Sequence, residues 1–171
     1  MTQSDLKTAT FAAGCFWGVQ SYFDEIPGVV ETKVGYTGGH VDNPNYDLVC
    51  TNTTGHAEAV EIKFDPKKIS YLNLVKEFFK CHNPTTLNRQ GPDIGFQYRS
   101  AIFYHDLEQK KIAEEYRHKL EKSGKLGSRL IVTEIVKAEK FWPAEEYHQK
   151  YFAKKGMEAA ACHVAYPDQV V

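Results

Sequence analysis

The chain has 171 residues, of which 42% are hydrophobic and 25% charged, and it carries two Trp, ten Tyr and ten Phe. This length corresponds to one domain covering residues 1–171, and the apolar content excludes a disordered chain or a small disulfide-stapled protein. The 21 basic and 22 acidic side chains nearly cancel, so we expect no nucleic acid and no membrane as a partner.

Short β-rich runs alternate with amphipathic helical runs along the chain. In chain order, we predict a strand at 9–13, a helix at 15–23, strands at 29–36 and 57–64, a helix at 70–79, a strand at 98–104, a helix at 106–123, a strand at 130–136 and a helix at 144–154. Ser70 and Asp106 are expected N-caps, and Asp106 forms a capping-box pattern with Gln109. The connections 37–55 and 82–97 are long and rich in Gly, Asn, Pro and Thr, which favours functional loops.

The first six predicted elements follow the order β-α-β-β-α-β, which is typical of a ferredoxin-like unit. We therefore expect an α+β fold, a two-layer sandwich with a mixed or antiparallel sheet. Its core is expected at about 8–154. A coil-rich C-terminal tail at about 155–171 shows no clear periodicity.

The segment Gly14-Cys15-Phe16-Trp17-Gly18 lies where a predicted strand gives way to a helix. Free N–H groups and the helix dipole at this point stabilise a thiolate, the nucleophilic form of cysteine. The glycines allow a sharp turn similar to the nucleophile elbow of hydrolases, although the G-x-S-x-G spacing is absent. A small buried residue at a helix start is the plainer interpretation of Cys15, but the two glycines and two aromatic side chains favour a nucleophile.

Glu58 lies near the start of the predicted strand at 57–64. A period of two places its side chain on the same face as Val60 and Ile62, toward the core. A carboxyl group in that position has a raised pKa and can stay protonated as a proton donor. The pattern supports equally a carboxylate that turns toward solvent or caps a loop.

Tyr46, Asp93 and Tyr98 lie in or beside the two long connections. Taken singly, each is typical of a turn or of a packing tyrosine. Taken together near a thiol, two phenols and an acid can bind and protonate a developing oxyanion.

The four cysteines, Cys15, Cys50, Cys81 and Cys162, form no C-x-x-C pair. The beginning of the sequence lacks the features of a signal peptide and no apolar run could span a membrane, so we expect a cytoplasmic protein with reduced thiols. Cys50 and Cys81 are predicted to pack, and Cys162 is an ordinary thiol by pattern alone. The adjacent Cys-His pairs do not have the spacing of zinc ligands, so we predict no metal site.

The Gly14–Gly18 segment resembles the signature of the A-type peptide methionine sulfoxide reductases, also called peptide-methionine (S)-S-oxide reductases. Six further blocks are similar to those of that family, in the same order, between about Phe11 and Phe152. They are Gly35-Tyr36-Thr37-Gly38-Gly39, Asn43-Pro44-Asn45-Tyr46, Gly55-His56-Ala57-Glu58-Ala59-Val60, Asn88-Arg89-Gln90-Gly91, Gln97-Tyr98-Arg99-Ser100 and Glu146-Tyr147-His148-Gln149.

The resemblance implies an oxidoreductase that returns the S epimer of methionine sulfoxide, free or in proteins, to methionine. It also implies a role for each of the residues above. Cys15 attacks the sulfoxide sulfur, Glu58 donates a proton, Tyr46, Asp93 and Tyr98 surround the sulfoxide oxygen, and Phe16 and Trp17 hold the substrate's methyl group.

The resemblance further implies how the thiol is restored. Cys15 becomes a sulfenic acid, a resolving thiol condenses with it, and an external dithiol such as thioredoxin reduces the disulfide. Cys162 lies where some relatives place a resolving cysteine, but the tail lacks their glycine-rich sequence, so glutaredoxin or a small thiol is the alternative. We expect a monomer without a bound cofactor.

Two other function classes compete with the reductase. A cysteine hydrolase would use Cys15 as an acylated nucleophile, but the sequence offers no persuasive histidine partner. A metal-binding module is disfavoured by the ligand spacing.

Overall fold

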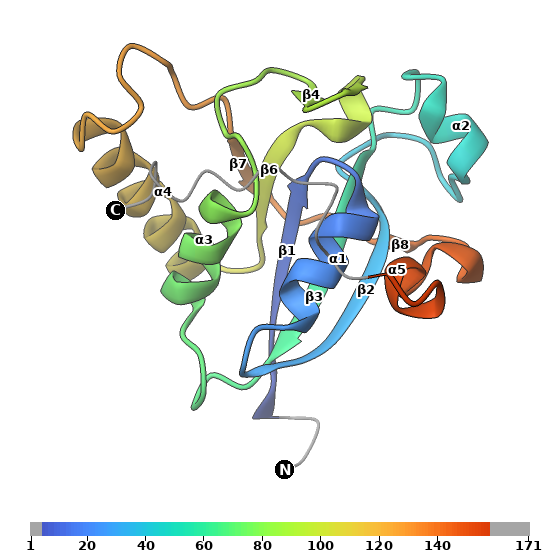
Figure 1. The fold of residues 1–171 in the computed structure, drawn as a ribbon, viewed down its shortest axis with the longest axis horizontal. Coiled ribbons are helices and arrows are strands. Elements are labelled where there is room, and N and C mark those ends of the chain that lie inside the picture. Colours follow the sequence, from blue (N-terminus) through green and yellow to red (C-terminus); the bar gives the residue numbers. More distant parts are fainter. Residues whose placement is uncertain (1–4, 158–171) are drawn as a thin grey trace.

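The computed structural model describes residues 5–157 and contains a six-stranded sheet with the order β7-β6-β1-β3-β2-β8 (Figure 1). The strands are β1 (Lys7–Ala13), β2 (Val29–Thr37), β3 (Ala57–Phe64), β6 (Ser100–Tyr104), β7 (Glu134–Lys137) and β8 (Trp142–Pro143). Neighbouring strands are antiparallel except β6 and β7, which are parallel, so the sheet is mixed. A separate hairpin pairs β4 (Arg89–Gln90) with β5 (Asp93–Ile94).

Three helices pack on the sheet: α1 (Phe16–Asp24), α3 (Tyr71–Lys80) and α4 (Leu107–Lys122) (Figure 1). Shorter helical segments are α2 (Tyr46–Cys50), η2 (Phe96–Tyr98), η3 (Glu146–His148) and α5 (Tyr151–Lys154). Ser70 and Asp106 cap α3 and α4 as predicted, since their side chains accept hydrogen bonds from the N–H groups three residues later. Within the described range, no helix is long and apolar enough to cross a membrane.

The main hydrophobic core lies between the sheet and these helices. The ring of Phe11 from β1 is 5.5 Å from that of Phe23 in α1 and 5.1 Å from that of Phe78 in α3, measured between centroids. All three side chains are fully buried, and burying each contributes about 1.5–3 kcal/mol. A smaller cluster around Phe103, with Phe141 packed on it, contains alanines of β1, β3 and β6. The core therefore fixes α1 against the middle strands, β1 and β3.

The long connections contain more regular structure than predicted. Segment 37–55 includes α2, whose N-cap Asn45 accepts a hydrogen bond from the N–H of Leu48. Segment 82–97 includes the β4–β5 hairpin and the start of η2. The strand predicted at 98–104 begins only at Ser100, because Tyr98 belongs to the 3-10 turn.

Two predicted C-terminal elements are wrong in part. The strand predicted at 130–136 begins only at Glu134, because the preceding backbone pairs elsewhere: the N–H of Val132 donates to the carbonyl oxygen of Pro84 at 2.8 Å. The helix predicted at 144–154 is divided into η3 and α5 at Gln149 and Lys150, where Lys150 has a left-handed φ of 53°. Tertiary contacts override the helical pattern here.

Candidate active site

Cys15 lies at the N-cap of α1, directly after β1. Gly14 has a φ of 96°, in the left-handed region that favours glycine, and this allows the chain to turn from strand into helix. The thiol is half-buried and lies at the positive end of the helix, which favours the thiolate. The strand–helix junction predicted from the sequence therefore exists.

Glu58 faces the beginning of α1 from β3. Its side chain is only 2% exposed and lies on the core face with Val60 and Ile62. Its Oε2 accepts a hydrogen bond from the N–H of Phe16 at 3.1 Å. Burial raises the pKa of Glu58 to about 8, because it outweighs the hydrogen bond from Phe16, and the charge of Asp93 adds to the rise. At neutral pH this carboxyl group is mostly protonated, bonded to the residue next to the thiol.

Two phenols and a second carboxyl group complete the cluster. Tyr46 begins α2 and Tyr98 ends η2; burial is the main cause of the raised pKa of each, and the charge of Glu58 adds to both. The charge of Cys15 also acts on Tyr46, and that of Asp93 on Tyr98. Burial raises the pKa of half-buried Asp93 itself. All five groups therefore interact at one place, and both phenols stay protonated as hydrogen-bond donors.

Cys50, which the sequence pattern predicted as a packing residue, also belongs to this cluster. Its thiol is half-buried and hydrogen-bonded to the side chain of Tyr46. Residues four apart share one face of a helix, and this spacing could have shown the pair, but the segment was predicted as a loop. Cys81 is buried as predicted, and its Sγ donates to the carbonyl oxygen of Phe78 at 3.2 Å.

Phe16 and Trp17 lie against a histidine that the sequence pattern did not single out. The indole Nε1–H of Trp17 donates to Nδ1 of His148 at 2.9 Å. The centroid of the His148 ring is 5.1 Å from that of Phe16 and 4.7 Å from that of Tyr46. His148 lies in the Glu146–Gln149 block, which was the only sequence signal for it. The structure thus joins Phe16 and Trp17 to the site and adds His148.

One predicted site residue, Cys162, lies outside residues 5–157, where the structure describes nothing. In those described residues, no group of three or more His, Cys, Asp or Glu side chains is arranged to hold a metal ion.

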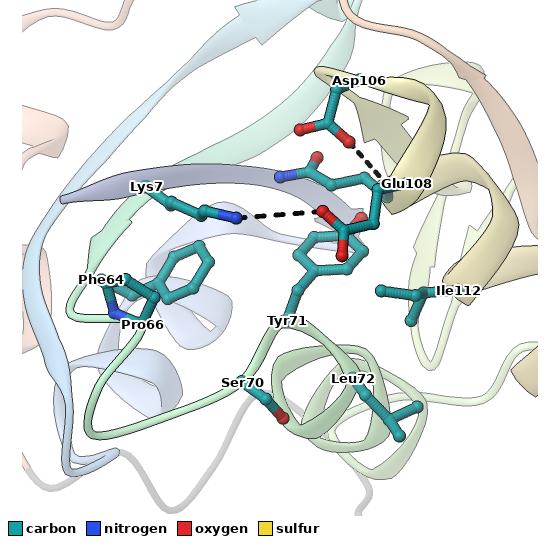
Figure 2. Close-up of a pocket in the computed structure, with 10 residues that line it drawn as sticks. Lys7, Phe64, Pro66, Ser70, Tyr71, Leu72, Asp106, Glu108 and Ile112 are labelled. Atoms are coloured by element: carbon teal, nitrogen blue, oxygen red, sulfur yellow. Dashed lines mark hydrogen bonds and ion pairs between the residues drawn. The ribbon is translucent and has the colours of Figure 1, made fainter. Parts of the chain in front are cut away.

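A separate cavity of about 230 Å³ lies at the other end of β1 (Figure 2). Lys7, Phe64 and Tyr71 line it, beside the first turns of α3 and α4. Lys7 begins β1 and Cys15 follows its end, so the strand separates the two places by roughly 20 Å. This cavity is therefore not part of the thiol cluster.

A thiol at a helix N-terminus, close to a mostly protonated carboxyl group and two phenols, is an arrangement that can attack an electrophile while donating a proton to an oxygen atom. The family model described as "Peptide methionine sulfoxide reductase" matches residues 7–170. The chain belongs to this family, and it is an oxidoreductase that reduces methionine sulfoxide.

Individual relatives agree with this assignment. The peptide methionine sulfoxide reductase MsrA of Methanosarcina acetivorans is 58% identical over 151 residues, which cover 88% of this chain and 80% of that protein. The crystal structure of reduced Mxr1 from Saccharomyces cerevisiae is 36% identical with a TM-score of 0.81, covering 96% of this chain and 94% of that one. The structure of Mxr1 in complex with Trx2 is 27% identical with a TM-score of 0.58, covering 96% and 91%.

Proposed function

We propose that Cys15 is the nucleophile that reduces the S epimer of methionine sulfoxide, free or within proteins, and that Glu58 is the proton donor. The observation that carries this proposal is the 3.1 Å hydrogen bond between the N–H of Phe16 and Glu58, since it joins a mostly protonated carboxyl group to the residue after the thiol. The preference for one epimer follows from the resemblance, because each sulfoxide epimer has its own enzyme.

The proposed chemistry begins when the Cys15 thiolate attacks the sulfoxide sulfur while Glu58 gives its proton to the oxygen. A bond forms between the two sulfur atoms as the S–O bond of the substrate breaks. The released hydroxide then attacks the Cys15 sulfur, which breaks the bond between the sulfur atoms and leaves a thioether and a Cys15 sulfenic acid. The substrate sulfur is reduced to a thioether and the cysteine sulfur is oxidised by the same amount. Tyr46 and Tyr98 donate hydrogen bonds to the oxygen as negative charge develops on it.

The other site residues support this step. Asp93 helps to keep Glu58 protonated through its charge. Phe16 and Trp17 form an apolar wall against which the methyl group of the substrate packs. An apolar contact of this kind discriminates between the two epimers only because the oxygen is held at the same time by polar donors.

For recycling, we propose that Cys162 condenses with the sulfenic acid and releases water, and that the dithiol of thioredoxin then reduces the disulfide by exchange. The solved complex of the yeast relative with Trx2 supports this partner. Electrons from the dithiol are sufficient for this cycle, so the proposal includes no bound cofactor. Glutaredoxin or a small thiol is the alternative reductant.

The strand order β6-β1-β3-β2 supports a ferredoxin-like core, which we propose at about 8–154 with β7 and β8 added at its edges. A single catalytic domain acting as a monomer in the cytoplasm belongs to the same proposal. A compartment that keeps thiols reduced suits a reaction that starts from the Cys15 thiolate.

The proposal is tested by measuring loss of each sulfoxide epimer, with dithiothreitol as reductant, for the wild type, Cys15→Ser and Cys81→Ser. We expect Cys15→Ser to abolish turnover. Cys81→Ser is the matched control, because a serine hydroxyl can donate the same hydrogen bond to Phe78, and it should keep the wild-type rate. Full turnover by the Cys15 variant would falsify the nucleophile, and equal rates on both epimers would contradict the proposed specificity.

A further inference from the structure

The segment that contains η3 places two further side chains, Glu145 and His148, beside the site. The reaction described above uses neither of them. His148 is 1% exposed, and its Nδ1 accepts the indole N–H of Trp17 at 2.9 Å. Its Nε2 is 3.5 Å from Oε2 of Glu145. The indole of Trp17 also stacks on Tyr151, with ring centroids 3.8 Å apart. Trp17, which forms one side of the proposed methyl-binding wall, is thus held in place by residues of this segment and of the adjoining α5.

The hydrogen bond from Trp17 fixes the state of the histidine ring. An indole N–H can only donate, so Nδ1 of His148 must be an acceptor and carries no hydrogen. In the neutral ring the hydrogen then lies on Nε2, on the side of the Glu145 carboxylate. If the ring were protonated, two N–H groups would face each other at the Trp17 contact. The contact therefore exists only with neutral His148.

Glu145 connects this arrangement to the opposite side of the site. Its Oε1 accepts the backbone N–H of Tyr46 at 2.9 Å. Its Oε2, which faces His148, also accepts the hydroxyl of Tyr36 at 2.9 Å. Although burial acts in the other direction, the hydrogen bonds lower the pKa of Glu145, so it is ionised. One carboxylate thus anchors the start of α2 and borders the ring that holds Trp17.

We propose that His148 is a positioning residue for sulfoxide reduction: its neutral Nδ1 fixes the Trp17 indole as the wall of the methyl pocket, while Glu145 lies beside the ring and anchors the backbone of Tyr46. This inference rests on the proposed role of Trp17 in holding the substrate. The wall contacts the substrate both before and during the reaction. Loss of its anchor therefore weakens substrate binding and raises KM more than it lowers kcat.

The arrangement also makes binding sensitive to acid. Among the described residues, the titratable groups that face His148 are Glu145 and Tyr147 on its own segment and Tyr46 on α2. Burial lowers the pKa of His148 more than the charge of Glu145 raises it. The ring is therefore neutral at physiological pH, and its protonation in acid breaks the bond to Trp17 and raises KM.

The test compares His148→Leu, which removes the acceptor, with His148→Asn, whose Oδ1 takes the position of Nδ1. Rates with dithiothreitol give kcat and KM for methionine sulfoxide. We expect His148→Leu to raise KM about tenfold, the effect of one lost buried hydrogen bond, with kcat changed less than about threefold. His148→Asn should have a KM close to that of the wild type at neutral pH. In acid, where the KM of the wild type rises, the KM of this variant should stay unchanged.

A double-mutant cycle with Trp17→Phe completes the test, since phenylalanine has no N–H to anchor. In that background His148→Leu should add nothing to KM. Three outcomes would each overturn the positioning role. The effects of the two substitutions on KM could be additive, or His148→Leu and His148→Asn could raise KM equally. The third is a lower kcat at unchanged KM, which is what partial unfolding gives. A wild type that reduces no sulfoxide would instead contradict the proposed function itself.

Discussion

At the scale of single residues, the burial of Glu58 suits it to the proposed proton donation but lowers the stability of the folded protein at neutral pH. Its pKa rises from 4.5 to about 8 on folding, mainly because the carboxyl group is buried. Between these values the folded protein holds a proton that the unfolded chain releases, so stability falls as pH rises through this window. Each pH unit in this window lowers the free energy of unfolding by about 1.4 kcal/mol. At pH 7 the loss amounts to about 3 kcal/mol.

Replacing Glu58 by Gln should therefore stabilise the protein at neutral pH, because the amide has no proton to lose. We expect a Tm about 5–10 °C above that of the wild type at pH 7.5 and a much smaller difference at pH 4.5, where the folded carboxyl group is protonated and the unfolded one has lost only about half of its protons. Thermal unfolding followed by circular dichroism at the two pH values measures this. A stabilisation of the same size at both would contradict the raised pKa.

The same substitution should have the opposite effect on the reaction. An amide cannot give up a proton to the sulfoxide oxygen, so we expect the single-turnover rate at pH 7 to fall about 100-fold. The wild-type rate should decline as pH rises above about 8, where Glu58 ionises, and the Gln variant should lack this decline. Rapid-quench measurement of methionine formation across pH 6–10 checks both statements.

Asp93 provides an independent check on that decline. Its charge raises the pKa of Glu58, so Asp93→Asn should move the alkaline decline in rate to lower pH. If the decline in the Asp93→Asn variant occurs at the same pH as in the wild type, it is caused by the ionisation of a group other than Glu58.

At the scale of elements, sequence patterns succeeded where local signals and packing agree. The alternation in β3 placed Glu58 on the core face, and Gly14 with Cys15 marked the turn into α1. Sequence patterns failed where contacts with residues distant in sequence determine the backbone conformation. Oε1 of Gln149 accepts the N–H of Val34 at 3.0 Å and its Nε2 donates to the Val34 carbonyl at 2.9 Å. This side chain pairs with β2 as a strand would, which no local pattern reveals.

The same limit explains the site residues that were missed. His148 was assigned to a helix because its segment has helical spacing, and its bond to Trp17 spans 131 residues of sequence. Cys50 was assigned to packing because α2 was predicted as a loop. Cys15, by contrast, was predicted from its immediate neighbours, and the alternation in β3 supported one of the two orientations that the sequence left open for Glu58.

Gln149 gives a prediction at this scale. Gln149→Ala should leave the N–H of Val34 without its partner, so we expect its amide to exchange about threefold to tenfold faster, as one lost hydrogen bond allows. Hydrogen exchange followed by NMR measures this. The control is Glu146→Ala on the same segment, whose side chain is 88% exposed and whose loss should leave Val34 protected. Equal exchange in both variants would show that the Gln149 side chain does not close this edge.

At the scale of the whole molecule, antiparallel pairing gathers the site at one end of the sheet. Ala13 at the end of β1 pairs with Ser100 at the start of β6. Thr37 at the end of β2 pairs with Ala57 at the start of β3. The segments that leave or enter the sheet there carry Cys15, Tyr98, Tyr46 and Glu58. Residues distant in sequence therefore meet at one end of the sheet, while the proposed resolving thiol, Cys162, belongs to the tail.

The whole-molecule prediction concerns which thiol closes the redox cycle. After one equivalent of methionine sulfoxide without reductant, the full chain should lose two hydrogens, about 2 Da, as Cys15 and Cys162 form a disulfide. Cys162→Ser should instead gain one oxygen, about 16 Da, as a sulfenic acid that dimedone traps. Intact mass spectrometry distinguishes the two products.

Cys50→Ser is the matched control, because Cys50 is the other thiol bonded within the cluster around Tyr46. It should form the disulfide as the wild type does, since Cys50 has no part in the proposed exchange and burial raises its pKa, which leaves little reactive thiolate. If Cys162→Ser still loses about 2 Da while the double variant with Cys50→Ser gains about 16 Da, Cys50 resolves the sulfenic acid and the assignment to the tail is wrong.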